Sequence, residues 1–206
     1  FAVAAWGSLE MPLPPLPTDY EKNAALLSTA EFVTANCFCR RDALERIGGL
    51  DERFRLAWRE DSDLHFSLLK AFPEPGRILP VPHAKVLHPL RPAEWGVSLK
   101  QARKAMYNAL LYKKHPKPYR ERIQSKPPWR YYASVAAGAS TAWSLAQGKR
   151  GWALAGASLW LGLTTEFMLR RLRGTSKSPR HIAEMALTSA LLPPLAISWR
   201  LYGGFK

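Results

Sequence analysis

Three apolar runs in the last third of the chain constrain its fold more than any other feature. They are "YYASVAAGASTAWSLA" at 131–146, "GWALAGASLWLGLTTEFML" at 151–169 and "HIAEMALTSALLPPLAISW" at 181–199. A helix needs about 20 apolar residues to cross a bilayer, so the second run qualifies and the other two are borderline. The runs lack the polar face that a helix of a soluble protein shows. We therefore predict transmembrane helices, with a soluble helical bundle as the alternative.

Basic residues assign the sides of this predicted membrane region. The loop 170–180 carries five Lys or Arg and no acid, whereas the loop 147–150 carries two. Because basic loops stay in the cytoplasm, residues 1–130 are expected on the cytoplasmic face of the inner membrane. Cys37 and Cys39 are the two cysteines of the chain, and they fit a reducing compartment.

A strongly basic segment, which we call the basic collar, joins the two parts of the chain at 91–130. It holds eleven Lys or Arg against two acids, in a chain of net charge +14. Such charge predicts an anionic neighbour, with lipid headgroups first and a phosphorylated substrate compatible with them. We expect no nucleic-acid partner, because the basic residues flank membrane-length runs and no groove-reading or base-stacking motif is present.

Residues 1–130 have the pattern of a mixed α/β domain, and 131–206 that of a membrane-associated helical region. A strand is predicted in 30–40, and a short helix follows that stops at Gly48–Gly49. The next helix begins in the acidic cluster "REDSD", with an apolar stripe of Leu64, Leu68 and Phe72 behind it. One or two short strands in 76–90 and a helix over 98–115 complete the predicted elements.

The acidic cluster belongs to a longer pattern, "TANCFCRRDALERIGGLDERFRLAWREDSDLHFSLL". A strand ends near a basic pair, a short helix leads to a Gly-Gly-hydrophobic-Asp-Glu turn, and a loop brings an aromatic residue and an acidic pair to a helix start. This block resembles the acceptor half of family 2 glycosyltransferases, enzymes of the GT-A fold. The resemblance implies the C-terminal part of a GT-A-type α/β domain, followed by the hydrophobic helices. Taken alone, the acids would mark only a charged first helical turn.

The resemblance also implies an activity and its residues. An inverting glycosyltransferase moves a sugar from a nucleotide-sugar donor to an acceptor hydroxyl, and a positioned base must take the hydroxyl proton. The implied base is Asp61, which a helix N-terminus would keep ionised, and Glu60 would orient the loop or the acceptor. Trp58, Arg59 and Arg91 are the predicted substrate-binding residues, with Trp58 offering an apolar face to a sugar ring. The acceptor is expected to be a glycan or a lipid-linked molecule delivered by the membrane.

The resemblance further implies a divalent metal, Mg²⁺ or Mn²⁺, to stabilise the leaving diphosphate. His88, after a short predicted strand, is the candidate ligand, although a surface or packed histidine is equally compatible with the sequence. The Asp-x-Asp motif that holds most of such a metal is not found in the expected place. A Val/Ile-rich strand followed by a nucleotide-binding loop is not found either, so the donor-binding half is expected to be absent from this chain. The chain would then be a fragment of a longer protein, a chain whose companion supplies that half, or a remnant. The Gln-x-x-Arg-Trp signature of processive synthases is also missing, which favours transfer of a single sugar.

A second interpretation stays open. The protein could be a non-enzymatic membrane protein whose basic collar binds anionic lipid or an acidic partner. The two interpretations differ at Asp61, which only the enzyme needs.

Overall fold

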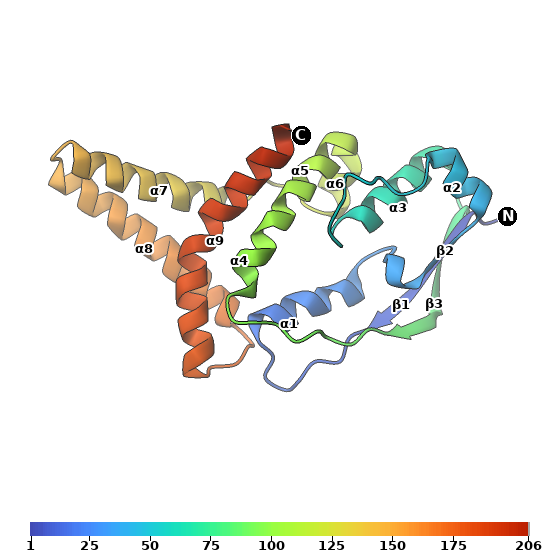
Figure 1. Ribbon diagram of the computed structural model, residues 1–206, viewed down its shortest axis with the longest axis horizontal. Coiled ribbons are helices and arrows are strands. Elements are labelled where there is room, and N and C mark those ends of the chain that lie inside the picture. Colours follow the sequence, from blue (N-terminus) through green and yellow to red (C-terminus); the bar gives the residue numbers. More distant parts are fainter. Residues whose placement is uncertain (206) are drawn as a thin grey trace.

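The protein is described for residues 1–205 by a computed structural model, with a small sheet at one end and a long helical hairpin at the other (Figure 1). The elements of the first part are β1 (Ala4–Glu10), α1 (Asp19–Ala24), η1 (Ala25–Thr29), η2 (Thr34–Asn36), β2 (Cys37–Cys39), α2 (Arg41–Ile47), α3 (Glu60–Ala71) and β3 (Ile78–Leu87). Those of the second part are α4 (Val97–Gln101), η3 (Ala102–Lys104), α5 (Ala105–Lys114), α6 (Pro116–Arg122), α7 (Trp129–Ala146), α8 (Arg150–Leu172) and α9 (Pro179–Phe205). The chain is thus mixed α/β, as predicted.

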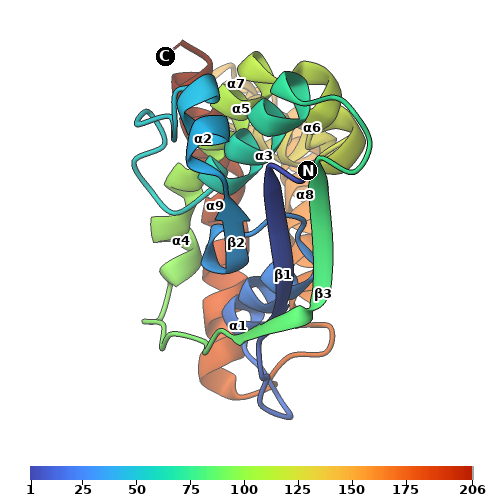
Figure 2. The same ribbon diagram turned by 90° about the vertical axis from the view of Figure 1, so that its right-hand side faces the viewer.

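The sheet has the order β2-β1-β3, with β2 antiparallel and β3 parallel to the central strand (Figure 2). The register between β1 and β3 shifts at Gly7/Ser8. The amide of Asn36 spans this irregularity, because its Nδ2 donates to the carbonyls of Ser8 (3.0 Å) and Ala84 (2.7 Å). A Cβ on Gly7 would lie 2.0 Å from the Ala84 carbonyl oxygen, so only glycine fits there.

One local prediction was wrong in extent, and one strand was missed. The strand expected over 30–40 is reduced to Cys37–Cys39, preceded by a 3₁₀ turn. The central strand β1 was not predicted at all, because "AAWGSLE" has neither β-branched residues nor a strict alternation. By contrast, β3 is one strand despite Pro80 and Pro82, which an edge strand tolerates because its outer N–H groups need no partner.

Helix α3 is the centre of the first part, because it contacts a core on each side. Leu64 and Leu68, with Phe72 just after the helix, pack with Val3, Ala4, Phe32 and Ala43 beneath the sheet. Phe66, on another side of α3, packs with Phe54, Tyr107, Leu110, Leu111 and Tyr119 of the α5–α6 region. The predicted apolar stripe is therefore confirmed. The position of α3 is set jointly by the sheet and by α5.

The helix predicted over 98–115 is divided into α4, η3 and α5. Helix α9 runs along all three of these and also contacts α7 and α8. Figure 1 shows α9 changing direction along its length, and Pro193 and Pro194 lie inside it. Close contact between α9 and α5 occurs at Gly203, where a Cβ would lie 2.2 Å from the Met106 carbonyl oxygen.

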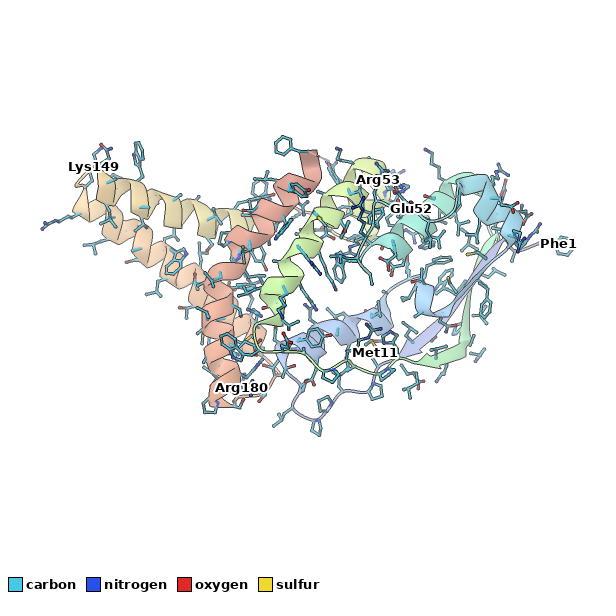
Figure 3. The ribbon with its side chains drawn as sticks, viewed as in Figure 1. Phe1, Met11, Glu52, Arg53, Lys149 and Arg180 are labelled. Atoms are coloured by element: carbon cyan, nitrogen blue, oxygen red, sulfur yellow. The ribbon has the colours of Figure 1, made fainter. Side chains whose placement is uncertain are left out.

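Helices α7 and α8 form the projecting hairpin, with Lys149 at its free tip (Figure 3). Among residues 1–205, α9 is the one helix long and apolar enough to cross a membrane, with a mean hydropathy of 1.3 over its best window. Helix α8, whose run was expected to qualify first, does not pass the same test. Glu166 lowers its hydropathy, and this carboxylate pairs with Arg130 and Arg170. The assignment of α9 as a candidate membrane-spanning helix rests on its length and composition.

The adjacent glycines at the end of α9 allow a matched test of its docking. We expect Gly203→Ala to destabilise the protein by about 1–3 kcal/mol, because the added methyl overlaps the α5 backbone and forces the helices apart. Gly204→Ala is the control: nothing lies within 4 Å of its Cβ, and alanine favours a helix. Thermal unfolding of both variants in detergent measures the difference. Equal melting temperatures would contradict the docking of α9 on α5.

Candidate functional site

The segment 48–59 delivers the predicted site residues to the start of α3. Gly48 ends α2 in the left-handed region, with φ of +80°, where a residue with a side chain would be strained. The turn that follows is held by Asp51, whose carboxylate accepts a hydrogen bond from the backbone N–H of Arg53 (3.0 Å). Glu52 and Arg53 lie on the loop beside α3 (Figure 3). Asp51 thus stabilises the turn through the backbone of Arg53.

A buried charge cluster ties this segment to α3 and α5. The ammonium nitrogen of Lys114 lies 2.5 Å from Oδ2 of Asp51 and 2.7 Å from Oδ1 of Asp63. His115 Nε2 lies 3.0 Å from the same Asp63 oxygen, and the Asp63 side chain is only 5% exposed. Hydrogen bonds from Arg53, and then from Lys114, hold the pKa of Asp51 below its usual range although partial burial opposes them. We name Asp51, Asp63, Lys114 and His115 the charge cluster.

The charge cluster changes the interpretation of two groups of residues. Asp63 was expected to be an ordinary first-turn acid, but its carboxylate points inward and pairs with two residues at the end of α5. Lys114 was assigned to the basic collar, but its ammonium group is engaged by two acids. No sequence signal identified His115, although a Lys-His pair at the end of an apolar helix is a hint of buried polar pairing.

Asp61 lies in the first turn of α3 and is partly buried. Its Oδ1 accepts hydrogen bonds from the backbone N–H (2.6 Å) and the hydroxyl (3.3 Å) of Ser62. Within residues 1–205, Ser62 is the only residue whose side chain is hydrogen-bonded to this carboxylate. Burial raises the pKa of Asp61, outweighing the Ser62 backbone N–H and the nearby Arg59, which lower it. The helix N-terminus was expected to keep Asp61 ionised by lowering its pKa, but burial has the larger effect.

Glu60 begins α3 and is also affected by burial, which raises its pKa. Its Oε2 atom is buried and has no hydrogen-bond partner among residues 1–205. An unpartnered buried oxygen costs free energy, so it marks a position where a further polar group could bind.

Trp58 and Arg59 are held by one residue of α5 that the sequence did not single out. The side-chain oxygen of Asn108 accepts hydrogen bonds from Trp58 Nε1 (3.2 Å) and Arg59 Nε (2.8 Å). The guanidinium of Arg59 and the ammonium of Lys104 lie over the Trp58 ring, 4.7 and 4.9 Å from its centroid. The ring therefore carries two cations, so it is not the bare apolar face that was predicted for a sugar. Arg59 itself has φ of +76°, a strained backbone conformation of the kind that concentrates at functional sites.

His88 and Arg91 lie elsewhere. Both follow β3, where the His88 backbone N–H donates to the Glu10 carbonyl (2.9 Å) and Arg91 is exposed. No hydrogen bond or ion pair in the described chain joins either residue to 58–61. His88 Nδ1 is buried without a partner, which leaves it free to bind a ligand. However, residues 1–205 contain no group of three or more His, Cys, Asp or Glu side chains arranged to hold a metal. The residues present do not make a complete metal site.

A cavity of about 260 Å³ lies away from the start of α3, between α1, α4 and the facing ends of α8 and α9. Arg171, which lines it, is buried and pairs with Asp19 at 2.8 Å. None of the predicted site residues lines this cavity. It belongs to the joint between the helical region and the rest of the chain.

The start of α3 thus combines a partly buried carboxylate with aromatic and basic side chains beside it. A family model described as "Glycosyl transferase family group 2" matches residues 19–201. The chain therefore belongs to this family of glycosyltransferases, as the resemblance indicated. Neither a curated protein nor a solved structure shows significant similarity to the chain. The family match covers the first part and the helices alike.

The charge cluster makes a stability prediction. Lys114→Met leaves the Asp51 and Asp63 carboxylates facing each other without their shared cation, so we expect a loss of about 3 kcal/mol. That is the lower end for a broken buried pair, because the Lys114 side chain is 24% exposed. Lys117→Met, at an exposed position of α6, should change stability by about 0.5 kcal/mol or less. Chemical unfolding compares them, and equal midpoints would show that the cluster is not stabilising.

Proposed function

We propose that the protein transfers a single sugar, with inversion, from a nucleotide-sugar donor to a glycan or lipid-linked acceptor at the cytoplasmic face of the inner membrane. The donor-binding half is proposed to be supplied from outside this chain. The observation that carries the proposal is the environment of Asp61. It is a partly buried carboxylate with one oxygen anchored and the other without a side-chain partner among residues 1–205, in a chain of a glycosyltransferase family.

Asp61 has the properties that a general base requires. The two Ser62 donors fix the orientation of Oδ1, and Oδ2 is left to accept the proton of an acceptor hydroxyl as it attacks the anomeric carbon. A raised pKa strengthens the carboxylate as a base, since proton transfer is most effective when the pKa approaches the working pH. Burial of Asp61 disfavours its ionised form. The same burial raises the pKa of this carboxylate, as the proposed base requires.

Glu60 and Arg59 flank this base and are proposed to contact substrate. The unpartnered Oε2 of Glu60 suits a hydrogen bond from a second acceptor hydroxyl. Arg59 and Trp58 are pre-oriented by Asn108, so little side-chain freedom is lost on binding. Arg91, exposed after β3, is proposed as a more distant contact.

A membrane location is proposed from α9 and from the packing of this helix. Helix α9 is apolar enough to span, and it packs on η3 and α5, which carry Lys104 and Asn108. An acceptor delivered by the membrane would thereby arrive beside the candidate site. Recovery of the protein in carbonate-washed membranes tests this placement.

A divalent metal, Mg²⁺ or Mn²⁺, remains part of the proposal. His88 offers one free nitrogen, and oxygen ligands usually dominate for these ions. Because the described residues form no ligand set of three, we assign no step of the reaction to a metal here.

The alternative, a membrane protein that only binds anionic lipid, is supported by the charge of the basic collar. Two lysines of that collar have other contacts: the Lys114 ammonium belongs to the charge cluster, and the Lys104 ammonium lies over the Trp58 ring. Lys100 and Arg103 stay exposed and remain available to lipid. The two functions are separated by the following variant.

Asp61→Asn should lower sugar transfer at least about 10²-fold, because the amide cannot take the acceptor proton. The assay uses the full-length protein in membranes with a panel of radiolabelled nucleotide sugars. Glu52→Gln, an exposed change in the preceding turn, is the control and should transfer normally. Equal transfer by Asp61→Asn and the unaltered protein would remove Asp61 as the base.

Asp61→Asn should also leave stability unchanged or raised at neutral pH. A carboxylate whose pKa is raised from 3.8 by burial favours the folded state only while protonated. Its contribution is present at low pH and is lost as the pH rises through the folded-state pKa, and the neutral amide avoids this loss. Melting temperatures at pH 4 and pH 7 check the sign. A variant that melts lower at pH 7 would mean that its inactivity reflects misfolding.

Metal dependence gives a separate expectation. Chelation with EDTA should abolish transfer, and added Mn²⁺ or Mg²⁺ should restore it. His88→Ala should raise the Mn²⁺ concentration needed for half-maximal transfer if His88 is a ligand, while leaving unfolding unchanged. Transfer that continues in EDTA would exclude the metal requirement.

A further inference from the structure

We propose that the cavity of about 260 Å³ between α1, α4 and the facing ends of α8 and α9 binds the hydroxyl groups of a neutral sugar. The inference goes beyond the proposed function, because none of the residues 58–61 lines this cavity. Its volume lies just below the range of about 300–1,000 Å³ that is typical of small-molecule sites, so it suits a ligand of single-ring size.

A buried histidine in the cavity wall has an unsatisfied hydrogen-bond donor. His181, in the first turn of α9, is only 4% exposed, and its Nε2 accepts a hydrogen bond from the backbone N–H of Asp19 (3.3 Å). The hydrogen of the neutral ring is therefore on Nδ1. This Nδ1 is buried and has no hydrogen-bond partner within residues 1–205. A buried donor without an acceptor costs free energy, and a ligand that accepts from it would remove this cost.

The carboxylate of Glu184, one helical turn later, faces that donor without bonding to it. Its Oε2 lies 3.6 Å from His181 Nδ1, which is too long for a hydrogen bond, and its Oε1 accepts from the backbone N–H of Gly96 (2.8 Å). The Glu184 side chain is only 14% exposed, yet no Lys or Arg nitrogen of the described chain lies within 4.0 Å of it. A hydroxyl group serves both atoms, because its oxygen can accept from Nδ1 and its hydrogen can donate to Oε2.

The charges around the cavity favour a neutral ligand over an anion. The lining includes three acids, Asp19, Glu94 and Glu184, and two arginines, Arg171 and Arg180. Arg171 is not free to bind an anion, because its nitrogens already donate to Asp19, Ser98, Thr188 and Ser189. Arg180 is exposed, and its single charge balances that of Glu184. An ammonium ion is disfavoured as well, because it cannot accept a hydrogen bond from His181.

Apolar side chains complete the lining. Trp95, Val97 and Met185 border the same cavity. The indole of Trp95 is held by a hydrogen bond from its Nε1 to the Arg180 carbonyl (3.3 Å), and the residue stays 41% exposed. A sugar ring has C–H groups on its faces and hydroxyl groups around its rim, so it can contact apolar and polar side chains at once. Apolar walls with a few polar groups are the usual composition of a small-molecule site.

A sugar can reach this cavity from two sources. One is a free sugar in solution. The other is the sugar headgroup of a glycolipid, because the first two turns of α9, the candidate membrane helix, form part of the wall. Both sources present the same hydroxyl chemistry, and the experiment separates them.

The test is titration calorimetry on the full-length protein in a polyoxyethylene detergent, which has no sugar headgroup. The probes are glucose, galactose and mannose, and the octyl glycosides of the same three sugars. Glu184→Gln removes the carboxylate, and Ala93→Trp places a large side chain at an exposed position of the lining. Glu45→Gln, at an exposed position of α2, is the matched control.

We expect the unaltered protein and Glu45→Gln to bind at least one probe with equal affinity. Glu184→Gln and Ala93→Trp should bind the same probe at least about tenfold more weakly. Melting temperatures confirm that the variants fold. If Glu184→Gln does not fold, Ala93→Trp decides by the same criterion.

Each outcome decides the proposal. Weakened binding of a free sugar supports the site and assigns it to a soluble ligand, whereas an effect confined to the octyl glycosides supports it and assigns it to a glycolipid. Equal affinities of Glu184→Gln and Glu45→Gln for the bound probe would overturn it, as would failure of the unaltered protein to bind any of the probes. Displacement of a bound probe by inorganic phosphate or ethanolamine would contradict the assignment to a neutral hydroxyl ligand. Because binding is measured and not transfer, the result does not depend on Asp61.

Discussion

The ammonium group of Lys114, shared between Asp51 and Asp63, is the interaction on which the site depends. Asp51 belongs to the loop that follows α2, Asp63 to the first turn of α3, and Lys114 to the end of α5. The loop and α3 carry Trp58, Arg59 and Asp61, and α5 carries Asn108. Separating the charges would leave the buried Asp63 carboxylate without the Lys114 ammonium and would leave Asp51 with Arg53 alone, so the segments are held in one arrangement.

The same arrangement explains how the apolar helix can influence the chemistry. Helix α9 packs on η3 and α5, and Gly203 permits its backbone to approach Met106. Helix α5 in turn holds Trp58 and Arg59 through Asn108. A chain of direct contacts therefore joins the candidate membrane helix to the start of α3. The candidate membrane helix and the segment that carries the proposed base are therefore linked through α5.

Asp61 and Asp63, two acids in the first turn of α3, have different surroundings. In the charge cluster, the buried carboxylate of Asp63 pairs with Lys114 and His115 and holds α3 against the end of α5. Two residues earlier, the partly buried Asp61 lacks such a cation, and its pKa is raised. Neighbouring acids of one helical turn thereby acquire different roles. Residues two positions apart on a helix face different directions, so the Asp63 carboxylate points to α5 and the Asp61 carboxylate does not.

The sequence by itself determined the family, the apolar stripe of α3 and the helix stop at Gly48, because these follow from local spacing and from a motif read along the chain. Asp61, Glu60, Trp58 and Arg59 were proposed as site residues in the same way, since they are contiguous. Only the tertiary structure decided the central position of β1, the inward turn of Asp63 and the convergence of Lys104, Asn108 and Lys114 on residues 51–63. Those contacts join positions about 45 to 63 residues apart, and their pairing depends on how α5 packs against α3. Local patterns contain no information on that packing, so a lysine at a buried joint and a lysine at a lipid surface look the same in the sequence.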